Sequence, residues 1–530
     1  MNINFQAILL LLELFALGIS SNRHEYADYW MKAGEAQLTG ILKDQQEHQK
    51  AKNVIIFVGD GMGMSTITAA RIYKGQKKGK SGETGFLSFE KFPTTGLAKT
   101  YAVDKQVTDS AASATALFTG VKTNYLLLGL DARAKYNVCD SSTNKESSVS
   151  SIMTWAQNAS KDTGFVTTTR ITHATPAALY AHTNSRYWEC NSQIPHTYST
   201  CVKDIALQLV TDDPGRKFKV IMGGGANQLG LKGVNGSTYG GCNRTDGINL
   251  AQEWIKNKSN SLLIKTRKEL NNIDPEKTEY LLGLFGPDHL SYAGDQKKSS
   301  DQPSLVDMTV NAIKILSKNP NGFVLMVEGG RIDHAHHENY AQLALEETLE
   351  FEDAVAAAVS ITDKKQTLII VTADHSHSLT INGYPDRGNS ILGISDNENE
   401  TYETLTYANG PGYTYHRLYN SDTQEIWINL KNSSLQRNGT FYRHFSPLYL
   451  TAETHSGEDV PVYACGPSSS LFSGVYDHNY IAHAISHASC IGPHATTCNV
   501  KSGAVTIFMS YCVYVLTTFI HVSILASKMI

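Results

Sequence analysis

The feature that most constrains the fold is a regular alternation of short apolar runs with helix-like segments. The apolar runs are rich in β-branched residues and cover 54–58, 165–169, 219–222, 323–327 and 367–372. Helical patterns lie between them, as at 65–73, 205–210 and 305–316. This alternation predicts an α/β fold with a large, mostly parallel central sheet flanked by helices on both faces. Strands buried on both sides are expected to be continuously apolar, as these runs are.

Carboxylate and imidazole side chains follow several of these runs. Those just beyond the first, fourth and fifth runs are Asp60, Glu328, Asp333, His337, Asp374 and His375. Because the carboxyl ends of parallel strands meet at one edge of an open α/β sheet, we expect these side chains to share a site there. Carboxylates and imidazoles together suit zinc. Ser110, in the small-residue stretch 108–116, adds a hydroxyl that suits phosphoryl transfer beside metal ions.

The spacing of Asp333 and His337 indicates a shared metal ion. The two residues are four positions apart, so in a helical turn they project from the same face. His455 arrives from a distant segment and would complete a set of three ligands. Three protein ligands with one position open for water are typical of catalytic rather than structural zinc.

Five segments, at 54–63, 108–116, 327–337, 371–377 and 454–458, resemble the alkaline phosphatase family in their order and in much of the intervening sequence. The resemblance runs from about Tyr29 to about Cys490 and is to the eukaryotic, membrane-anchored type, such as the tissue-nonspecific, intestinal and insect enzymes. It implies hydrolysis of small phosphate monoesters to an alcohol and inorganic phosphate through a phosphoserine on Ser110. It also implies a homodimer with two zinc ions and one magnesium ion per subunit.

The resemblance assigns the metal ligands. It gives the first zinc Asp333, His337 and His455, and the second zinc Asp60, Asp374 and His375, with Ser110 as a fourth ligand. It gives magnesium an all-oxygen set, the donors that this ion prefers, made of Asp60, Thr175 and Glu328. Contact with a metal would lower the pKa of the serine hydroxyl and prepare it for attack on phosphorus.

Arg186 matches the phosphate clamp of the family, and a guanidinium can pair with two phosphate oxygens at once. Read without the resemblance, Arg186 would be interpreted as a surface residue. We expect His173 to support the magnesium site and Asp109 to orient Arg186 or a water. We expect His377 to form a hydrogen bond near the second zinc or the phosphate. Glu458 and Asp459 are expected to shape the loop that carries His455.

Both ends of the chain carry apolar runs. The run at 8–17 ends near small residues and predicts a secretory signal peptide over 1–20, although a buried N-terminal helix is the alternative. The run at 504–526 is long enough to cross a bilayer. Only Lys528 follows it, which favours a GPI signal over a single-span anchor. We therefore predict a linker and GPI signal over 491–530, with the attachment site open between 492–497 and 502–504.

The eight cysteines and seven Asn-x-Ser/Thr sequons are typical of the secretory pathway, which would deliver the protein to the outer face of the cell membrane. Resemblance to vertebrate relatives implies the pairs Cys139–Cys201 and Cys490–Cys498. For a third pair we hypothesise Cys190–Cys242. With Cys512 in the removable tail, Cys465 is then left over and is expected to be an inert buried thiol.

Between the signals we predict an N-terminal helical arm over 21–53 and a catalytic domain over 54–378 and 452–490. The helices at 26–38 and 41–53 resemble the arm that family members lay across the neighbouring subunit. The stretch 379–451 is rich in Asn, Gly, Tyr, Thr and Ser and separates His375 from His455. The resemblance makes it a crown-like insertion, and a plain surface insertion is the alternative.

Other functions fit the sequence less well. A net charge of −4 gives no basic footprint, so nucleic acid is not an expected partner. Related folds host sulfatases and phosphodiesterases, so fold alone does not decide. A sulfatase needs a Cys/Ser-x-Pro-x-Arg context, and phosphodiesterase relatives generally use threonine and lack the magnesium ligands. A catalytically silent surface receptor would be expected to have lost a nucleophile or ligand, whereas every expected position is occupied here.

Overall fold

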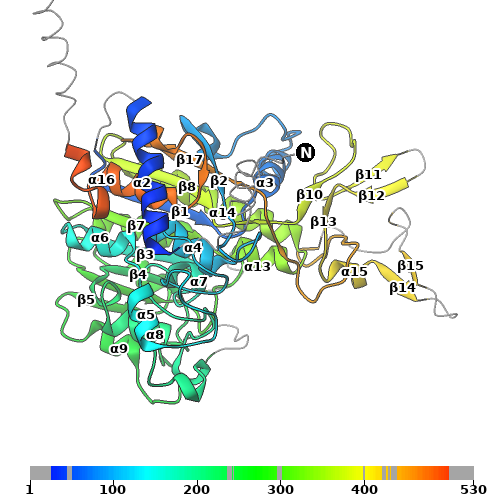
Figure 1. Ribbon diagram of the computed structural model, residues 1–530. Coiled ribbons are helices and arrows are strands. Elements are labelled where there is room, and N and C mark those ends of the chain that lie inside the picture. Colours follow the sequence, from blue (N-terminus) through cyan, green and yellow to red (C-terminus); the bar gives the residue numbers. More distant parts are fainter. Residues whose placement is uncertain are drawn as a thin grey trace, which may run out of the picture.

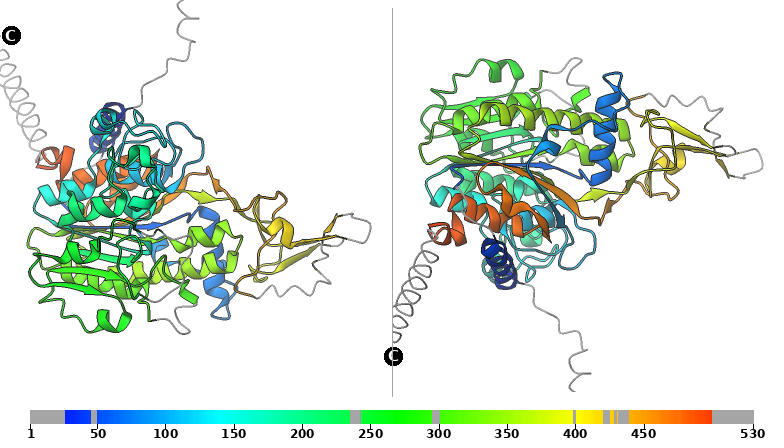
Figure 2. Two further views of the ribbon diagram at one scale, coloured as in Figure 1. Left: turned by 90° about the horizontal axis from the view of Figure 1, so that it is seen from below. Right: turned by 90° about the horizontal axis from the view of Figure 1, so that it is seen from above.

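The computed structural model describes residues 26–44, 50–234, 242, 244–294, 301–397, 400–419, 425–427, 430 and 439–499. The signal peptide and most of the C-terminal tail, including the 502–504 candidate site, lie outside them. A ten-stranded sheet runs through the centre with helices on both faces (Figures 1 and 2). Its order is β18 (Gly474–Asp477), β2 (Thr94–Lys99), β17 (Val460–Cys465), β8 (Thr367–Ala373), β1 (Asn53–Gly59), β7 (Phe323–Gly329), β3 (Asp162–Arg170), β4 (Val220–Gly224), β6 (Tyr280–Leu284) and β5 (Ser261–Ile264).

The sheet is mixed and mostly parallel, which confirms the predicted fold class. Only β17 runs antiparallel to its neighbours in this sheet, which are β2 and β8. The apolar side chains of β1 and β7 are fully buried, because helices cover both faces of these central strands. In the register of β1, Gly59 lies opposite both Gly329 of β7 and Ala373 of β8. The residues that follow these three positions are therefore delivered to one edge of the sheet.

The helices form two layers. On one face α14 (Ala341–Ile361) packs against α3 (Met64–Gln76), α12 (Leu305–Leu316) and α13 (Arg331–His337). On the other face α16 (Tyr480–Ser489) packs against α2 (Ala27–Asp44), α4 (Ser110–Thr119) and α6 (Ile152–Asn158), as Figure 2 shows. The shorter helices are α5 (Ser141–Ser147), α7 (Ala174–Ala177), α8 (Ile205–Thr211), α9 (Leu250–Ile255), α10 (Arg267–Asn271) and α15 (Gly412–Tyr415).

The insertion predicted over 379–451 extends away from the sheet as small two-stranded units (Figure 1). These pair β10 (Leu379–Ile381) with β13 (Leu405–Tyr407), β11 (Ile394–Asn397) with β12 (Glu400–Glu403), and β14 (Arg417–Tyr419) with β15 (Glu425–Trp427). At its base, β9 (Ser376–His377) pairs antiparallel with β16 (His455–Ser456), so that His377 lies opposite His455. After the insertion, this short ladder brings His455 back beside the residues at the end of β8.

The N-terminal arm is one helix, α2, which lies against α16. Close contact requires Gly34, since a Cβ there would lie 2.2 Å from the His483 ring. The predicted helix over 41–53 is wrong at its C-terminal end, where Ala51 donates to the Ala488 carbonyl and Asn53 opens β1. Contacts with α16 and with the sheet fix these residues in place of helical bonds. Among the described helices, none combines the length and apolar character that a bilayer span requires.

The structure confirms the three disulfides that were predicted. Cys139–Cys201, Cys190–Cys242 and Cys490–Cys498 are joined, with Cα–Cα distances of 6.2, 6.2 and 5.6 Å. Cys465 is a free thiol at the end of β17, half-buried rather than fully buried. Burial raises its pKa to about 11, so it is protonated and unreactive at neutral pH.

Two buried histidines near α16 predict a steep loss of stability in acid. Burial lowers the pKa of His478 to about 3 and that of His483 to about 4. In an unfolded chain both would titrate near 6.5, so below about that pH the unfolded state binds more protons. Their contribution is complete above about pH 6.5 and falls by roughly 1.4 kcal/mol per residue per pH unit below it. The variant H478Q/H483Q should therefore show a shallower dependence of unfolding free energy on pH in urea titrations between pH 6.5 and 5.

The exposed His196 provides the control for this prediction. The H196Q variant should keep the wild-type slope. If H478Q/H483Q also keeps the wild-type slope, the acid sensitivity does not come from these two imidazoles.

Candidate active site

The first group of candidate ligands forms where α13 meets β16. Nε2 of His337 and Nε2 of His455 each lie 3.3 Å from Oδ1 of Asp333, and 3.2 Å from each other. Nδ1 of His337 donates to the Glu453 carbonyl at 2.5 Å, and Nδ1 of His455 donates to the Thr108 carbonyl at 2.9 Å. Because each proton is on Nδ1, both Nε2 lone pairs point toward Asp333. Imidazoles fixed in this tautomer are suited to hold a metal ion.

The second group lies at the ends of β1 and β8. Nε2 of His375 is 3.4 Å from Oδ1 of Asp60 and 3.3 Å from Oδ2 of Asp374. Ser110 Oγ is 3.3 Å from the same nitrogen. All four residues are buried, yet no described residue donates a hydrogen bond to either Asp60 oxygen or to Oδ2 of Asp374. Buried carboxylate oxygens without donors fit a bound cation.

The electrostatic properties of the second group also favour a bound cation. Burial, reinforced by the charges of Asp333, Asp374 and Glu328, raises the pKa of Asp60 well above its usual range. Burial also raises the pKa of Asp374 to about 6. Carboxylates this close repel one another, and a divalent cation between them would remove that repulsion.

The third group is made of oxygen donors. Oε2 of the buried Glu328 accepts hydrogen bonds from Thr167 and, at 3.1 Å, from Thr169, which leaves its Oε1 toward the site. Burial raises the pKa of Glu328 to about 7, and the Thr175 hydroxyl lies close enough to lower it in part. With Asp60, these atoms form the hard oxygen set that fits Mg²⁺. A nitrogen of His173 lies within 4.8 Å of Asp60 and Glu328 oxygens, so His173 adjoins this group directly.

Ser110 is the first residue of α4, and Asp109 caps this helix. The Asp109 side chain accepts from the backbone N–H groups of Ala111 and Ala112 at 3.1 and 3.3 Å. Its Oδ2 also accepts from Nη1 of Arg186 at 3.1 Å, a contact that suits the predicted role of Asp109 in orienting this arginine. Nη2 of Arg186 lies 3.2 Å from Nε2 of His173. The positive end of a helix and a guanidinium thus face the same region, an arrangement that suits a phosphoryl group.

His377 lies between the first two groups. We expected it to form a hydrogen bond near the second zinc or the phosphate; it lies within 4.8 Å of His375 of the second group, and its ring donates to Oδ1 of Asp333 at 2.7 Å and to Oε2 of Glu453 at 2.5 Å. Burial opposes its charge, but the two carboxylates outweigh burial and raise its pKa to about 10. His377 is therefore a cation that orients Asp333 of the first group, because the β9–β16 pairing places it there.

Sequence reasoning missed Glu453. Its carboxylate accepts from His377 and, at 2.7 Å, from the Ser378 N–H, while its carbonyl holds His337. Its position two residues before His455 was a usable signal, but the sequence prediction considered only the acids after His455, which are Glu458 and Asp459. Of these, Glu458 accepts from the Ser376 hydroxyl at 2.5 Å and so joins the His455 loop to β9, as expected.

Three further imidazoles, those of His173, His289 and His334, pack edge to face near the third group, with ring centroids 4.3 to 5.4 Å apart. Guanidinium groups face them: Nη1 of Arg170 lies 2.5 Å from His289, and Nη1 of Arg331 lies 2.8 Å from His334. These positive neighbours disfavour a cation among the three rings.

The comparisons with known proteins agree with this geometry. The family model described as alkaline phosphatase matches residues 51–491. The chain is 46% identical to Alkaline phosphatase 4 of Drosophila melanogaster, over 88% of this chain and 82% of that protein. It is 40% identical to the membrane-bound alkaline phosphatase of Bombyx mori, over 89% and 87% of the two chains.

Among solved structures, a cold-active alkaline phosphatase from a psychrophilic Shewanella species superposes with a TM-score of 0.58. It is 25% identical, and the match covers 82% of this chain and 99% of that one. A family model that spans most of the chain, together with relatives of this identity, shows the family. The chain belongs to the alkaline phosphatase family, whose members are phosphomonoesterases.

Proposed function

We propose that this enzyme hydrolyses phosphate monoesters through a phosphoserine on Ser110, with two zinc ions and one magnesium ion per subunit. The observation that carries the proposal is the place of the Ser110 hydroxyl. It lies at the start of α4, 3.3 Å from His375 and beside carboxylate oxygens to which no described residue donates, and the adjacent Asp109 binds Arg186. A nucleophile, a cation site and an anion clamp therefore meet at one point.

The three groups of donors suit different ions. Asp333, His337 and His455 would hold one zinc, and Asp60, Asp374 and His375 would hold the other, with Ser110 as an additional ligand. Asp60, Thr175 and Glu328 would hold magnesium through oxygen alone. When bound, the ions supply Lewis acidity that favours the ionised serine and stabilises charge on the attacking and leaving oxygens.

The proposed reaction consists of two displacements at phosphorus, in which residues of the chain take part directly. Arg186, held by Asp109, pairs with two phosphoryl oxygens and aligns phosphorus with Ser110 Oγ. Oγ then bonds to phosphorus as the bond to the alcohol oxygen breaks, and the alcohol takes up a proton. A water then attacks phosphorus on the side opposite Ser110 Oγ. The bond between phosphorus and Oγ breaks, inorganic phosphate leaves, and one proton of the water passes to Ser110 Oγ.

An acid-quench experiment tests the covalent step. The protein is incubated with ³²P-labelled inorganic phosphate near pH 5, quenched in acid and digested. We expect label on a single peptide that contains Ser110. Label on another residue, or none in a protein that hydrolyses p-nitrophenyl phosphate, would contradict the phosphoserine.

Substitution of Glu453 should weaken zinc binding without touching a ligand. The change E453Q removes the charge that fixes His377, which in turn orients Asp333. Loss of such outer partners costs about 10- to 100-fold in metal affinity. Competition with a zinc chelator, read from zinc content, should show that loss. The control E458Q removes a nearby carboxylate that accepts from the hydroxyls of Ser376 and Ser456 rather than from His377, and its zinc affinity should fall much less than that of E453Q. Equal affinity in E453Q would rule out this role.

We also propose the domain division, the homodimer and the membrane attachment. The separate hairpins within 379–451 and the helix α2 fit a crown-like insertion and an arm for a second subunit. The name of the Bombyx mori relative supports attachment to a membrane, for which we propose a GPI anchor after transit through the secretory pathway. Sequons at Asn158 and Asn257 lie on exposed residues that could carry glycans.

A further inference from the structure

Behind the proposed phosphate clamp, Arg170 ties together three segments of the chain. Its Nε and Nη2 donate to the two carboxylate oxygens of Glu189 at 2.8 and 2.6 Å. Its Nη1 donates to Oδ1 of Asp288 at 2.7 Å. The side chains of all three residues are largely buried, with exposed fractions of 16, 7 and 3%. The Arg170–Glu189 contact is thus a buried bidentate pair, the strongest geometry open to an ion pair.

The two partners stand close in sequence to residues of the site. Arg170 ends β3, three positions before His173, and Glu189 follows Arg186 by three positions. At the site itself, Nη2 of Arg186 and Nε2 of His173 are 3.2 Å apart. The 170–173 and 186–189 segments therefore meet twice, at the site through Arg186 and His173 and behind it through Arg170 and Glu189. Thr172 strengthens the contact behind the site, because its hydroxyl also donates to Oε2 of Glu189, at 2.6 Å.

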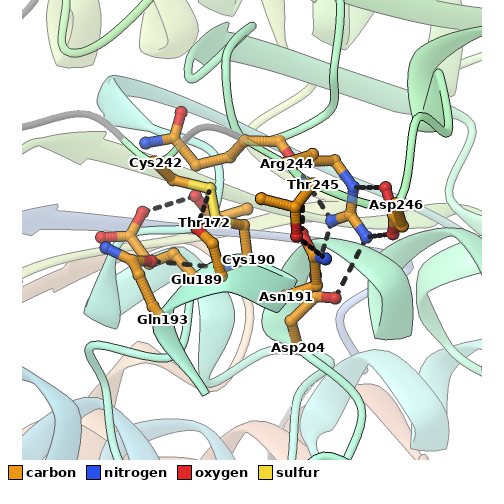
Figure 3. The surroundings of a disulfide bond; sticks show 12 residues. Thr172, Glu189, Cys190, Asn191, Gln193, Asp204, Cys242, Arg244, Thr245 and Asp246 are labelled. Carbon is orange, nitrogen blue, oxygen red and sulfur yellow. Dashed lines mark hydrogen bonds and ion pairs between the residues drawn. A yellow bond between two sulfur atoms is a disulfide. The ribbon is translucent and has the colours of Figure 1, made fainter. Parts of the chain in front are cut away.

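The segment that carries Arg186 has no regular helix or strand from residue 178 to 190 to hold it. Its backbone is held by hydrogen bonds to other segments. The Arg186 N–H donates to the Leu126 carbonyl at 3.0 Å, and the N–H groups of Ile205 and Ala206 donate to the Trp188 and Glu189 carbonyls at 2.9 and 3.1 Å. The next residue, Cys190, is bonded to Cys242, and Figure 3 shows this disulfide beside Glu189 and Thr172. The disulfide and the Glu189 ion pair thus fix adjacent residues, three and four positions after Arg186.

We propose that Arg170 and Glu189 are positioning residues that hold Arg186 and His173 in place for the phosphoryl group. This inference rests on the proposed function, since it assigns Arg186 the binding of phosphate. A displacement of a binding group by about 1 Å can cost roughly 100-fold. Because Arg186 is on a loop held only by isolated backbone bonds, these buried side-chain contacts supply a further restraint on its position.

The test uses inorganic phosphate as a competitive inhibitor of p-nitrophenyl phosphate hydrolysis. In E189Q, which keeps the size of the side chain but removes the charge, we expect the inhibition constant for phosphate and KM to rise about 10- to 100-fold. We expect kcat to change less than KM. In an R186A background, the same E189Q change should add almost nothing, because the residue it positions is gone.

A matched control comes from the same disulfide-bonded loop. Arg244 forms a buried ion pair with Asp204 at 2.8 Å, both side chains being 2% exposed, and Figure 3 shows it beyond Cys242. This pair does not reach the 170–173 segment, but Asp204 caps α8, whose first residues bind the Trp188 and Glu189 carbonyls. D204N therefore loosens the loop without removing the Glu189 side-chain contacts, and it should lower the melting temperature at least as much as E189Q while raising the inhibition constant for phosphate much less. A D204N effect on phosphate as large as that of E189Q would mean that general loosening of the loop, not positioning, is responsible.

If E189Q does not fold, T172V replaces it, since it removes one hydrogen bond to Glu189 and keeps the ion pair. We then expect a rise of about 3- to 10-fold in the inhibition constant, less than the full equivalent of one hydrogen bond to a charged group, because Thr172 acts on Arg186 only through Glu189. An unchanged constant in whichever of these variants folds overturns the proposal. A wild type without phosphatase activity would instead contradict the proposed function, so the two failures are distinguishable.

Discussion

Replacement of Ser110 by alanine should abolish turnover while leaving the fold and the metal content intact. The hydroxyl is the only group of residue 110 that the proposed displacement uses, and alanine suits the first turn of α4 at least as well. Loss of a catalytic nucleophile costs between roughly 10³- and 10⁶-fold in kcat. We expect the lower part of that range if water can occupy the place of the hydroxyl. The measurement is kcat for p-nitrophenyl phosphate at saturating zinc and magnesium.

Ser113 provides the matched control for this substitution. It lies on the same helix, is fully buried, and its hydroxyl contacts the Ser110 carbonyl at 3.4 Å. S113A should keep kcat within a few-fold of the wild type. An S110A protein with more than a tenth of wild-type kcat would contradict the assignment of Ser110 as nucleophile.

Replacement of Asp60 by asparagine should have a comparably large effect, for a different reason. Asp60 borders both the second group and the oxygen-only group, so a single change weakens two metal sites. We expect loss of zinc and magnesium in elemental analysis and a fall in kcat/KM of at least about 10³-fold, since a metal-stabilised alkoxide is no longer available.

The same variant should be more stable than the wild type once metals are removed. Both Asp60 oxygens are buried, receive no hydrogen bond from any described residue and lie close to Asp374 and Glu328, so the negative charge of Asp60 is unfavourable unless a cation is bound. In EDTA, the melting temperature of D60N should therefore exceed that of the wild type. D131N is the control, because Asp131 is equally buried but pairs with Arg133, and its loss should lower the melting temperature. If metal-free D60N has a lower melting temperature than the metal-free wild type, the Asp60 charge does not destabilise the empty site, and this argument for a cation site is wrong.

The sequence was sufficient to predict the central sheet and the edge at which the site forms. The runs at 54–58, 323–327 and 367–372 became β1, β7 and β8, whose ends align at Gly59, Gly329 and Ala373. This follows from local rules, since buried parallel strands are continuously apolar and end together. The convergence of Asp60, Asp374 and His375 was therefore predictable from the sequence alone.

Other parts of the site depend on contacts that sequence spacing does not reveal. His377 points to Asp333 because β9 pairs with β16 across the whole insertion, and Glu453 is placed by the same return of the chain. The Arg170–Glu189 pair joins segments with no shared motif. Likewise, the residues at 50–53 join the sheet and α16 instead of extending a helix, because tertiary pairing outweighs local propensity.

The most direct test of the account is the hydrolysis of p-nitrophenyl phosphate at pH about 9–10 by the purified protein, before and after chelation of its metal ions. Zinc and magnesium are then restored separately, and circular dichroism verifies that the protein stays folded. We predict that chelation removes activity, that zinc restores it and that magnesium raises it further. Full activity in a protein shown to be free of metal, or none in a folded protein loaded with both ions, would contradict the proposed metal-dependent phosphomonoesterase mechanism.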